Sequence, residues 1–235
     1  MSDTSRAALQ TDVLDDVRRA LGRSETLTPL PLGPFVDPPL EEEGTTLVNR
    51  FTAEAVSLGC KVYQVDTVKA LADRVAEICT EAGAREIVLS DAVLLQELSL
   101  SSKLQQDRFS INHVREFSKR SKEDLVAHLA ASSVGITAVD YAIAETGTIV
   151  LTSDEEQALL VSLLPPIHIA VLKSAQIKQS LTTVIEKLNV ARMGREAPCR
   201  SATFITGPSR TSDVELTLSI GVHGPKELHL FILSS

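Results

Sequence analysis

The stretch KVYQVDTVKALADRVAEICTEAGAREIVL, residues 61–89, decides the fold class of this chain. Lys61–Val65 is rich in β-prone residues, and Glu86–Leu89 is a second short strand candidate. Between them, Asp66 or Thr67 caps a helix whose apolar positions repeat about every 3.6 residues. After the second strand, Ser90–Asp91 is a predicted helix start. Strands and helices keep alternating beyond it, so we predict an α/β fold with an open, largely parallel sheet flanked by helices. The later apolar runs that we interpret as buried strands are His168–Leu172, Ala202–Thr206 and Leu228–Leu233.

Proline content divides the chain into two parts. Five of the ten prolines lie between residues 26 and 40, after a short amphipathic segment. Missing amide donors and restricted backbone angles make such a proline-rich stretch extended. We therefore expect residues 1–43 to form an N-terminal helix and a proline-rich arm, and residues 44–235 to form the α/β domain.

Charge and composition exclude several classes of partner. The 235 residues include 23 basic and 31 acidic side chains, for a net charge of −8, and 3% of the residues are aromatic with no Trp. Nucleic-acid binders need a basic surface, and those that bind single strands also need stacking rings. We expect no nucleic-acid partner.

The three cysteines, Cys60, Cys79 and Cys199, are far apart and form no C-x-x-C pair. Iron–sulfur clusters and structural zinc need clustered ligands, so we expect no metal in this chain. Sparse cysteines are typical of a reducing compartment, and no apolar run reaches the length of a membrane span or a leader. A cytoplasmic protein is therefore expected.

Glu145-Thr146-Gly147-Thr148 lies at a predicted tight turn between two β-prone stretches. A carboxylate at such a turn can act as a base, a nucleophile or a hydrogen-bond acceptor for a ligand. The alternative is a polar hairpin turn with a solvated Glu145. His168 follows Leu164-Pro165-Pro166 at a predicted strand start, where a single histidine is more often structural than catalytic.

Two segments near the C-terminus favour a site for an anion. Gly207-Pro208-Ser209-Arg210-Thr211 precedes a predicted helix that Ser212 and Glu215 would cap, and it offers amides, hydroxyls and a guanidinium. The alternative is simple helix capping with a solvent-facing Arg. In Gly221-Val222-His223-Gly224-Pro225, two glycines let the backbone approach a ligand or another loop. Because ligands bind outside the carboxyl ends of strands in open sheets, we expect both segments and the Glu145 turn to meet there.

Four motifs in a fixed order resemble the LUD-domain family over about residues 45–235: AETGT at 144–148, LPPIH at 164–168, GPSRTSDVE at 207–215 and GVHGP at 221–225. The resemblance implies a fold similar to the glucosamine-6-phosphate deaminase, ribose-5-phosphate isomerase and CoA-transferase group. It also implies oxidation of L-lactate to pyruvate with two partner proteins that carry iron–sulfur clusters. Without clustered cysteines, this chain resembles the cluster-free component, with a small anionic ligand and no cofactor of its own.

The resemblance extends to individual site residues. Related CoA-transferases have an active-site Glu two residues before a Gly, so Glu145 is the candidate catalytic residue by analogy of fold. The candidate ligand-binding residues are Thr146, Gly147, Thr148, His168, Gly207, Ser209, Arg210, Thr211, His223 and Gly224.

A second interpretation stays open. It is a stand-alone enzyme or ligand-binding protein of the CoA-transferase or formyltetrahydrofolate cyclo-ligase type, with a small anion, an acyl-CoA or a folate as ligand. The sequence does not decide whether the chain is catalytic alone, nor whether the proline-rich arm packs on a second copy in a homo-oligomer.

We predict that the chain by itself binds no iron–sulfur cluster, because its three cysteines are isolated in the sequence. Protein purified anaerobically should be colourless and hold no iron above background by elemental analysis. Stoichiometric iron would contradict the assignment to the cluster-free component.

Overall fold

Residues 61–89 form the predicted strand–helix–strand unit of β1 (Lys61–Val65), α3 (Val68–Glu81) and β2 (Glu86–Leu89). The Thr67 hydroxyl oxygen accepts a hydrogen bond of 3.1 Å from the Ala70 amide and caps α3. The structure therefore confirms the prediction: the apolar period and the cap at Thr67 indicate the same helix.

The computed structural model describes residues 45–106, 109–117, 121–153, 156–193, 201–212 and 218–234, together with Ala20. The predicted N-terminal helix and proline-rich arm, residues 1–43, otherwise lie outside the described residues. The further elements are α2 (Thr45–Ser57), α4 (Val93–Glu97), α5 (Leu100–Gln106), β3 (Ser110–His113), η1 (Val114–Phe117), α6 (Lys122–Ala131), β4 (Val134–Ala138), β5 (Tyr141–Ile143), β6 (Thr148–Ser153), α7 (Glu156–Leu163), β7 (Ile167–Lys173), η2 (Ser174–Gln176), β8 (Ile177–Lys178), α8 (Leu181–Met193), β9 (Ser201–Ile205), β10 (Arg210–Ser212), β11 (Leu218–Ile220) and β12 (Glu227–Leu233).

Six strands form one parallel sheet in the order β1-β12-β7-β4-β2-β3. The last strand of the chain, β12, is thus inserted between β1 and β7. In the middle of the sheet, Gly135 of β4 and Leu228 of β12 are both register partners of His168 of β7. The predicted fold class, an open and largely parallel sheet flanked by helices, is confirmed.

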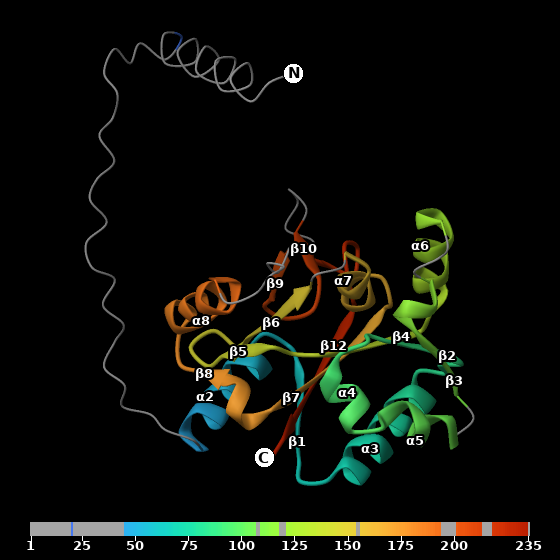
Figure 1. The fold of residues 1–235 in the computed structure, drawn as a ribbon, viewed down its shortest axis with the longest axis horizontal. Coiled ribbons are helices and arrows are strands. Elements are labelled where there is room, and N and C mark those ends of the chain that lie inside the picture. Colours follow the sequence, from blue (N-terminus) through green and yellow to red (C-terminus); the bar gives the residue numbers. More distant parts are fainter. Residues whose placement is uncertain are drawn as a thin grey trace. The chain divides into compact units, whose positions relative to one another are not determined.

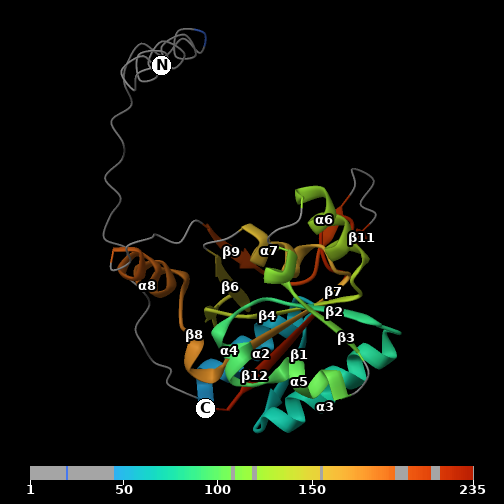
Figure 2. The same cartoon turned by 45° about the vertical axis from the view of Figure 1, so that its right-hand side comes forward.

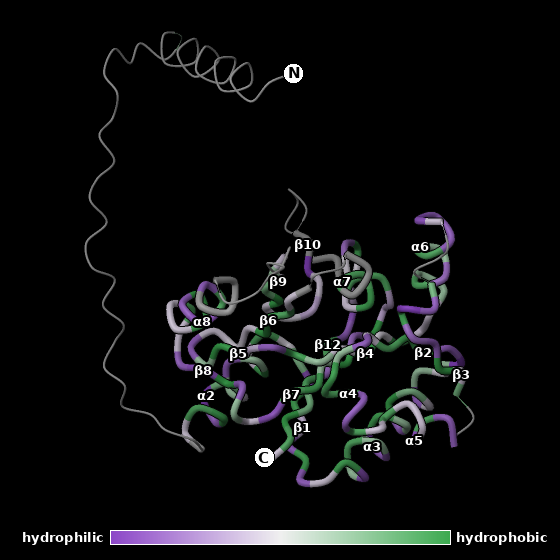
Figure 3. The backbone as a smooth tube through the Cα atoms, viewed as in Figure 1, coloured by the Kyte–Doolittle hydropathy of each residue, from purple (hydrophilic) through white to green (hydrophobic). Residues whose placement is uncertain are grey.

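Both faces of this sheet are covered. Side chains of α3, α4 and α5 pack on one face, which is the lower side in Figure 1. Ile169 and Val171 of β7 belong to that core, whereas Ala170 and Leu172 point into a second core on the other face. The second core contains α2 and a smaller sheet. On the same face of the parallel sheet, α6 and α7 lie beside each other and pack over β2 (Figure 2). Apolar residues therefore concentrate along β7 and β12 in the middle of Figure 3.

The smaller sheet has the order β8-β5-β6-β9. β5 and β6 form an antiparallel pair around residues 144–147, which confirms the predicted turn. β9 pairs antiparallel with β6 and belongs to this sheet. The prediction of a buried strand over Ala202–Thr206 is therefore only partly right, because β9 lies at an edge and its residues alternate between half-buried and exposed.

Two predicted helix starts are wrong. Ser212 belongs to β10, which pairs antiparallel with β11, so the loop after Gly207 leads into a hairpin; residues 213–217 lie outside the described residues. After β2, α4 begins only at Val93, and neither Ser90 nor Asp91 caps it. Ser212 is instead the register partner of Leu218 in β11, and the Ser90 amide donates to the carbonyl oxygen of Ile136 in β4.

The turn at Gly147 fixes α2 against the smaller sheet. Gly147 has a φ of +62°, and a Cβ at this position would lie 2.5 Å from the backbone nitrogen of Ala55 in α2. A side chain is therefore opposed both by the left-handed backbone conformation and by the closeness of α2.

Alanine substitutions at Gly147 and Gly83 should separate the cost of the left-handed backbone conformation from the cost of the clash with α2. We expect Gly147→Ala to lower the free energy of unfolding by about 3 kcal/mol or more, because alanine adds a clash with α2 to the conformational cost. Gly83→Ala is the matched control: its φ is +61° and nothing lies within 4 Å of the added Cβ. It should therefore cost only about 1–2 kcal/mol. Urea unfolding followed by circular dichroism measures both, and equal losses would show that α2 can shift without cost.

Candidate functional site

The two C-terminal motif loops are held together through Ser209. Its amide donates to the carbonyl oxygen of Pro225 at 2.9 Å, and its own carbonyl accepts from the Gly221 amide at 3.0 Å. A Cβ on Gly224 would lie 3.3 Å from the Ser209 Cβ, so the small residue permits this close approach. The backbone thus brings the Gly-Pro-Ser-Arg and His-Gly-Pro segments to one place.

The Pro-Pro-Ile-His segment joins the same place. The carbonyl of Pro166 accepts hydrogen bonds from the amides of Lys226 and Glu227 at 2.8 and 3.3 Å. These contacts align the starts of β7 and β12 and leave His168 beneath the two loops.

A pocket of about 610 Å³ opens between these loops, α7 and the sheet. Of the predicted site residues, those that line it are His168, Gly207, Ser209, Arg210, His223 and Gly224. Leu159, Leu163, Phe204 and Leu228 contribute an apolar wall. None of its lining residues, all from the described part of the chain, is Asp or Glu. The basic and hydroxyl groups among them are suited to a ligand with a negative charge.

This pocket, called the amino-end pocket below, does not lie where the sequence predicts. His168 and Leu228 are each the second residue of their strand, so the pocket covers the amino ends of β7 and β12. The prediction of a site at the carboxyl ends is wrong for these loops. Residues 206–209 connect β9 to β10, and β9 is paired antiparallel. The rule that ligands bind at the carboxyl ends of parallel strands therefore does not apply to this loop.

His168 is a buried polar residue of this pocket, as is Ser162. The His168 side chain is 1% exposed, and its Nε2 shares a hydrogen bond of 2.8 Å with the hydroxyl of Thr137. Its Nδ1 has no partner among the described residues. Burial, and to a lesser extent His229, lower the pKa of His168 to about 3, so the ring is neutral. Thr137 is not among the residues that the sequence predicts for the site. The signal that could have identified it is a hydroxyl-bearing residue within the otherwise apolar strand over residues 134–138.

Arg210 has a structural contact in addition to its place in the pocket wall. Its guanidinium donates to the carbonyl oxygen of Leu58, just after α2. A Cβ at Gly59 would collide with this guanidinium, so the glycine makes room for it. Because a guanidinium carries several N–H donors, this contact leaves donors for a ligand.

The Glu145 turn lies outside the pocket. The Glu145 carboxylate accepts a hydrogen bond of 2.8 Å from the amide of Leu181, the first residue of α8, and so caps that helix. The Thr148 hydroxyl lies 2.8 Å from the hydroxyls of both Thr146 and Thr206. Thr206 lines the amino-end pocket, so the turn contacts the pocket lining through the hydrogen bond between Thr148 and Thr206. A catalytic role for Glu145 stays a prediction, and the Thr211 side chain lies outside the described residues.

The two described cysteines are buried. Burial raises the pKa of Cys79 to about 12 and that of Cys60 to about 11, the latter against the opposing charge of Arg210. Within the part of the chain that the structure describes, no three His, Cys, Asp or Glu side chains gather as a metal site. No helix in that part has the length and apolar character needed to cross a membrane.

A family model, known relatives and a solved structure each match most of this chain. Residues 48–233 match the model of the LUD domain family. Lactate utilization protein C of Halalkalibacterium halodurans is 30% identical over 79% of this chain and 78% of its own length. YkgG of Escherichia coli is 29% identical over 94% of this chain and 96% of its own length. A crystal structure of a DUF162 family protein from Deinococcus radiodurans has a TM-score of 0.57 and 21% identity, covering 82% of this chain and 99% of that one, which shows a shared fold.

The buried neutral His168 should make stability depend on pH. Its pKa is about 3 in the folded chain and about 6.5 when unfolded, so protonation favours the unfolded chain. The His168 contribution is present above about pH 6.5 and is lost at about 1.4 kcal/mol per pH unit as the pH falls toward 3.

Urea unfolding at pH 7, 6 and 5 measures this slope. The variant His168→Gln should flatten it, whereas His223→Gln, which removes an exposed ring of the same pocket, should not. If the free energy of unfolding depended on pH equally in the wild type and in His168→Gln, the pH dependence could not be assigned to His168.

Proposed function

Because this chain belongs to the LUD domain family, we propose that it is a component of a lactate utilization system. The observation that carries the proposal is the extent of the family match, which includes every loop that lines the amino-end pocket. Relatives that align over most of both chains carry the name lactate utilization protein C.

The amino-end pocket is the proposed place for the substrate. A 2-hydroxy acid needs a donor for its carboxylate and a polar partner for its hydroxyl. Arg210 and Ser209 supply charged and hydroxyl donors at the mouth, and the neutral His168 ring lies at the buried end. No carboxylate among the described lining residues opposes the charge of the acid.

The electron acceptor is proposed to lie in partner proteins. Oxidation of L-lactate to pyruvate releases two electrons and two protons, and iron–sulfur clusters are suited to take up the electrons one at a time. The described part of this chain has no cluster-type ligand set. We therefore assign the clusters to partners and the cluster-free role to this chain.

The size of the pocket favours a second candidate. L-lactate is far smaller than about 610 Å³, and the wall of Leu159, Leu163 and Phe204 would leave its small methyl group poorly packed. An anion with a larger apolar part, such as an acyl-CoA or a folate, would use both the Arg210 charge and this wall.

Loss of the gene should abolish or strongly slow growth of its host on L-lactate and leave growth on glucose unchanged. The wild-type gene should restore growth on L-lactate, whereas Arg210→Ala should not, because loss of a charge-assisted hydrogen bond weakens binding about ten- to a hundredfold. Arg210→Lys should fail almost as completely, because Lys keeps the charge and loses the planar fork.

Arg85→Ala is the matched control, since Arg85 is an exposed arginine outside the pocket, and it should restore growth fully. A tagged chain from cells grown on L-lactate should retain iron–sulfur proteins. Normal growth of the deletion strain on L-lactate would refute the proposal. Turnover of an acyl-CoA or folate by the purified chain would favour the second candidate.

A further inference from the structure

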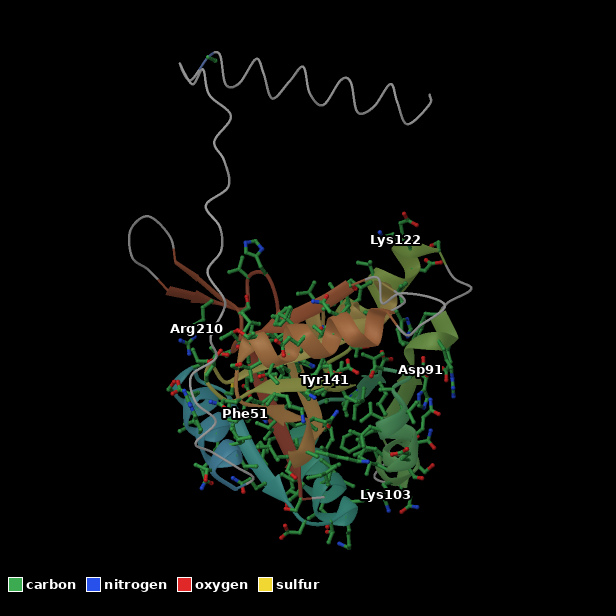
Figure 4. All side chains as sticks on the ribbon, turned by 60° about the vertical axis from the view of Figure 1, so that its left-hand side comes forward. Phe51, Asp91, Lys103, Lys122, Tyr141 and Arg210 are labelled. Carbon is green, nitrogen blue, oxygen red and sulfur yellow. The ribbon has the colours of Figure 1, made fainter. Side chains whose placement is uncertain are left out.

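A second pocket of about 410 Å³ lies at the other end of the parallel sheet. Ser90 and Asp91 directly follow β2, and Val139 and Asp140 directly follow β4; all four line this cavity, called the carboxyl-end pocket below. Figure 4 shows Asp91 far from Arg210, on the opposite side of the fold. None of the four motifs at 144–148, 164–168, 207–215 and 221–225 contributes a residue to this pocket.

The topology explains why a cavity forms here. β2 leads to β3 on one side of it, whereas β4 leads toward β7 on the other. Where the strand order reverses in this way, the chain segments that leave the two strands diverge and leave a crevice outside their carboxyl ends. The position is thus the ordinary place for a ligand in an open α/β sheet.

A buried hydroxyl in this pocket lacks a partner. Ser90 is 7% exposed, and its Oγ forms no hydrogen bond with any described residue, although its amide donates to Ile136 in β4 at 2.9 Å. A buried polar group without a partner is costly, so a ligand hydroxyl that pairs with Ser90 would recover that cost.

Two carboxylates are held in place at the same pocket. Asp91 Oδ2 accepts from the Arg115 amide at 2.8 Å, and its Oδ1 lies 3.3 Å from Arg115 Nε. Asp140 Oδ2 accepts from the amide and the hydroxyl of Thr152 at 2.6 and 3.0 Å. These contacts fix both groups before a ligand arrives.

The charge of the pocket selects against anions. Asp91 and Asp140 line it, and no Lys, Arg or His is among the described residues that do. Arg115 and His113 lie against Asp91 from outside the lining and offset part of its charge. A phosphate or carboxylate in the pocket would still meet the oxygens of two carboxylates, which accept hydrogen bonds readily from hydroxyls. Val93, Leu94 and Leu151 add apolar side chains on which the apolar part of a ligand can pack.

We propose that the carboxyl-end pocket binds a neutral ribonucleoside. Adjacent ribose hydroxyls would donate to Asp91 and pair with Ser90, and the base would pack on the apolar side chains. The volume of about 410 Å³ falls in the range of small-molecule sites. This proposal does not rest on lactate as the substrate of the amino-end pocket.

Ligand-observed NMR tests the proposal with adenosine, guanosine, cytidine and uridine, because the chain has no Trp for fluorescence titration. At least one ribonucleoside should bind, its 2′,3′-dideoxy counterpart should bind at least tenfold more weakly, and L-lactate should not compete. D-Ribose alone should bind much more weakly, because it lacks the ring that contacts the apolar side chains.

Asp91→Asn should weaken ribonucleoside binding about ten- to a hundredfold, and Ser90→Ala about two- to tenfold. Asp73→Asn, at an exposed aspartate of α3, is the matched control and should not change it. Circular dichroism melting checks that each variant folds, and Ser90→Ala keeps the test available if Asp91→Asn does not. Binding of no ribonucleoside, equal binding of dideoxy forms, equal binding of free ribose, or binding unaffected by both variants would each overturn the proposal.

Discussion

Strand β7 has to be covered on both faces, and the other described elements are arranged around that requirement. Residues 168–172 are all buried, with alternate side chains entering two separate cores. A polar group buried in this way is costly without a partner, and the Thr137 hydroxyl supplies one to Nε2 of His168. Helices α3, α4 and α5 cover one face, and the smaller sheet with α2, α6 and α7 covers the other. Both layers follow from the same need to exclude water from β7 and its neighbours.

The two ends of this sheet have different chemistry because different kinds of segment leave them. At the amino ends, loops from the antiparallel part bring Arg210 and His223 over β7 and β12. At the carboxyl ends, the direct continuations of β2 and β4 supply Asp91 and Asp140. Leu159 of α7 lines both pockets, and the hydrogen bond between Thr137 and His168 connects a residue of one with a residue of the other. The basic and acidic linings therefore lie on one continuous face of the sheet.

Local signals were sufficient for most of the fold. Thr67 caps a helix as predicted because the residues after it have a strong helical period. Ser90 and Ser212 resemble caps equally well, yet one enters a pocket and the other pairs with β11, because contacts distant in sequence override a local preference. The same limit applies to the site. The motifs identified the loops, but only the order of strands decides which end of the sheet Arg210 occupies and that Glu145 caps α8 instead of facing the pocket.

The depth at which Cys60 and Cys79 lie affects how this protein withstands oxidants. Peroxides and disulfides react with thiolates, and a thiol with a pKa of about 11 is ionised in only about one molecule in ten thousand at neutral pH. Cys79, with a pKa of about 12, is ionised still less. Both thiols of the described fold should therefore react much more slowly with such reagents than an exposed cysteine with an ordinary pKa.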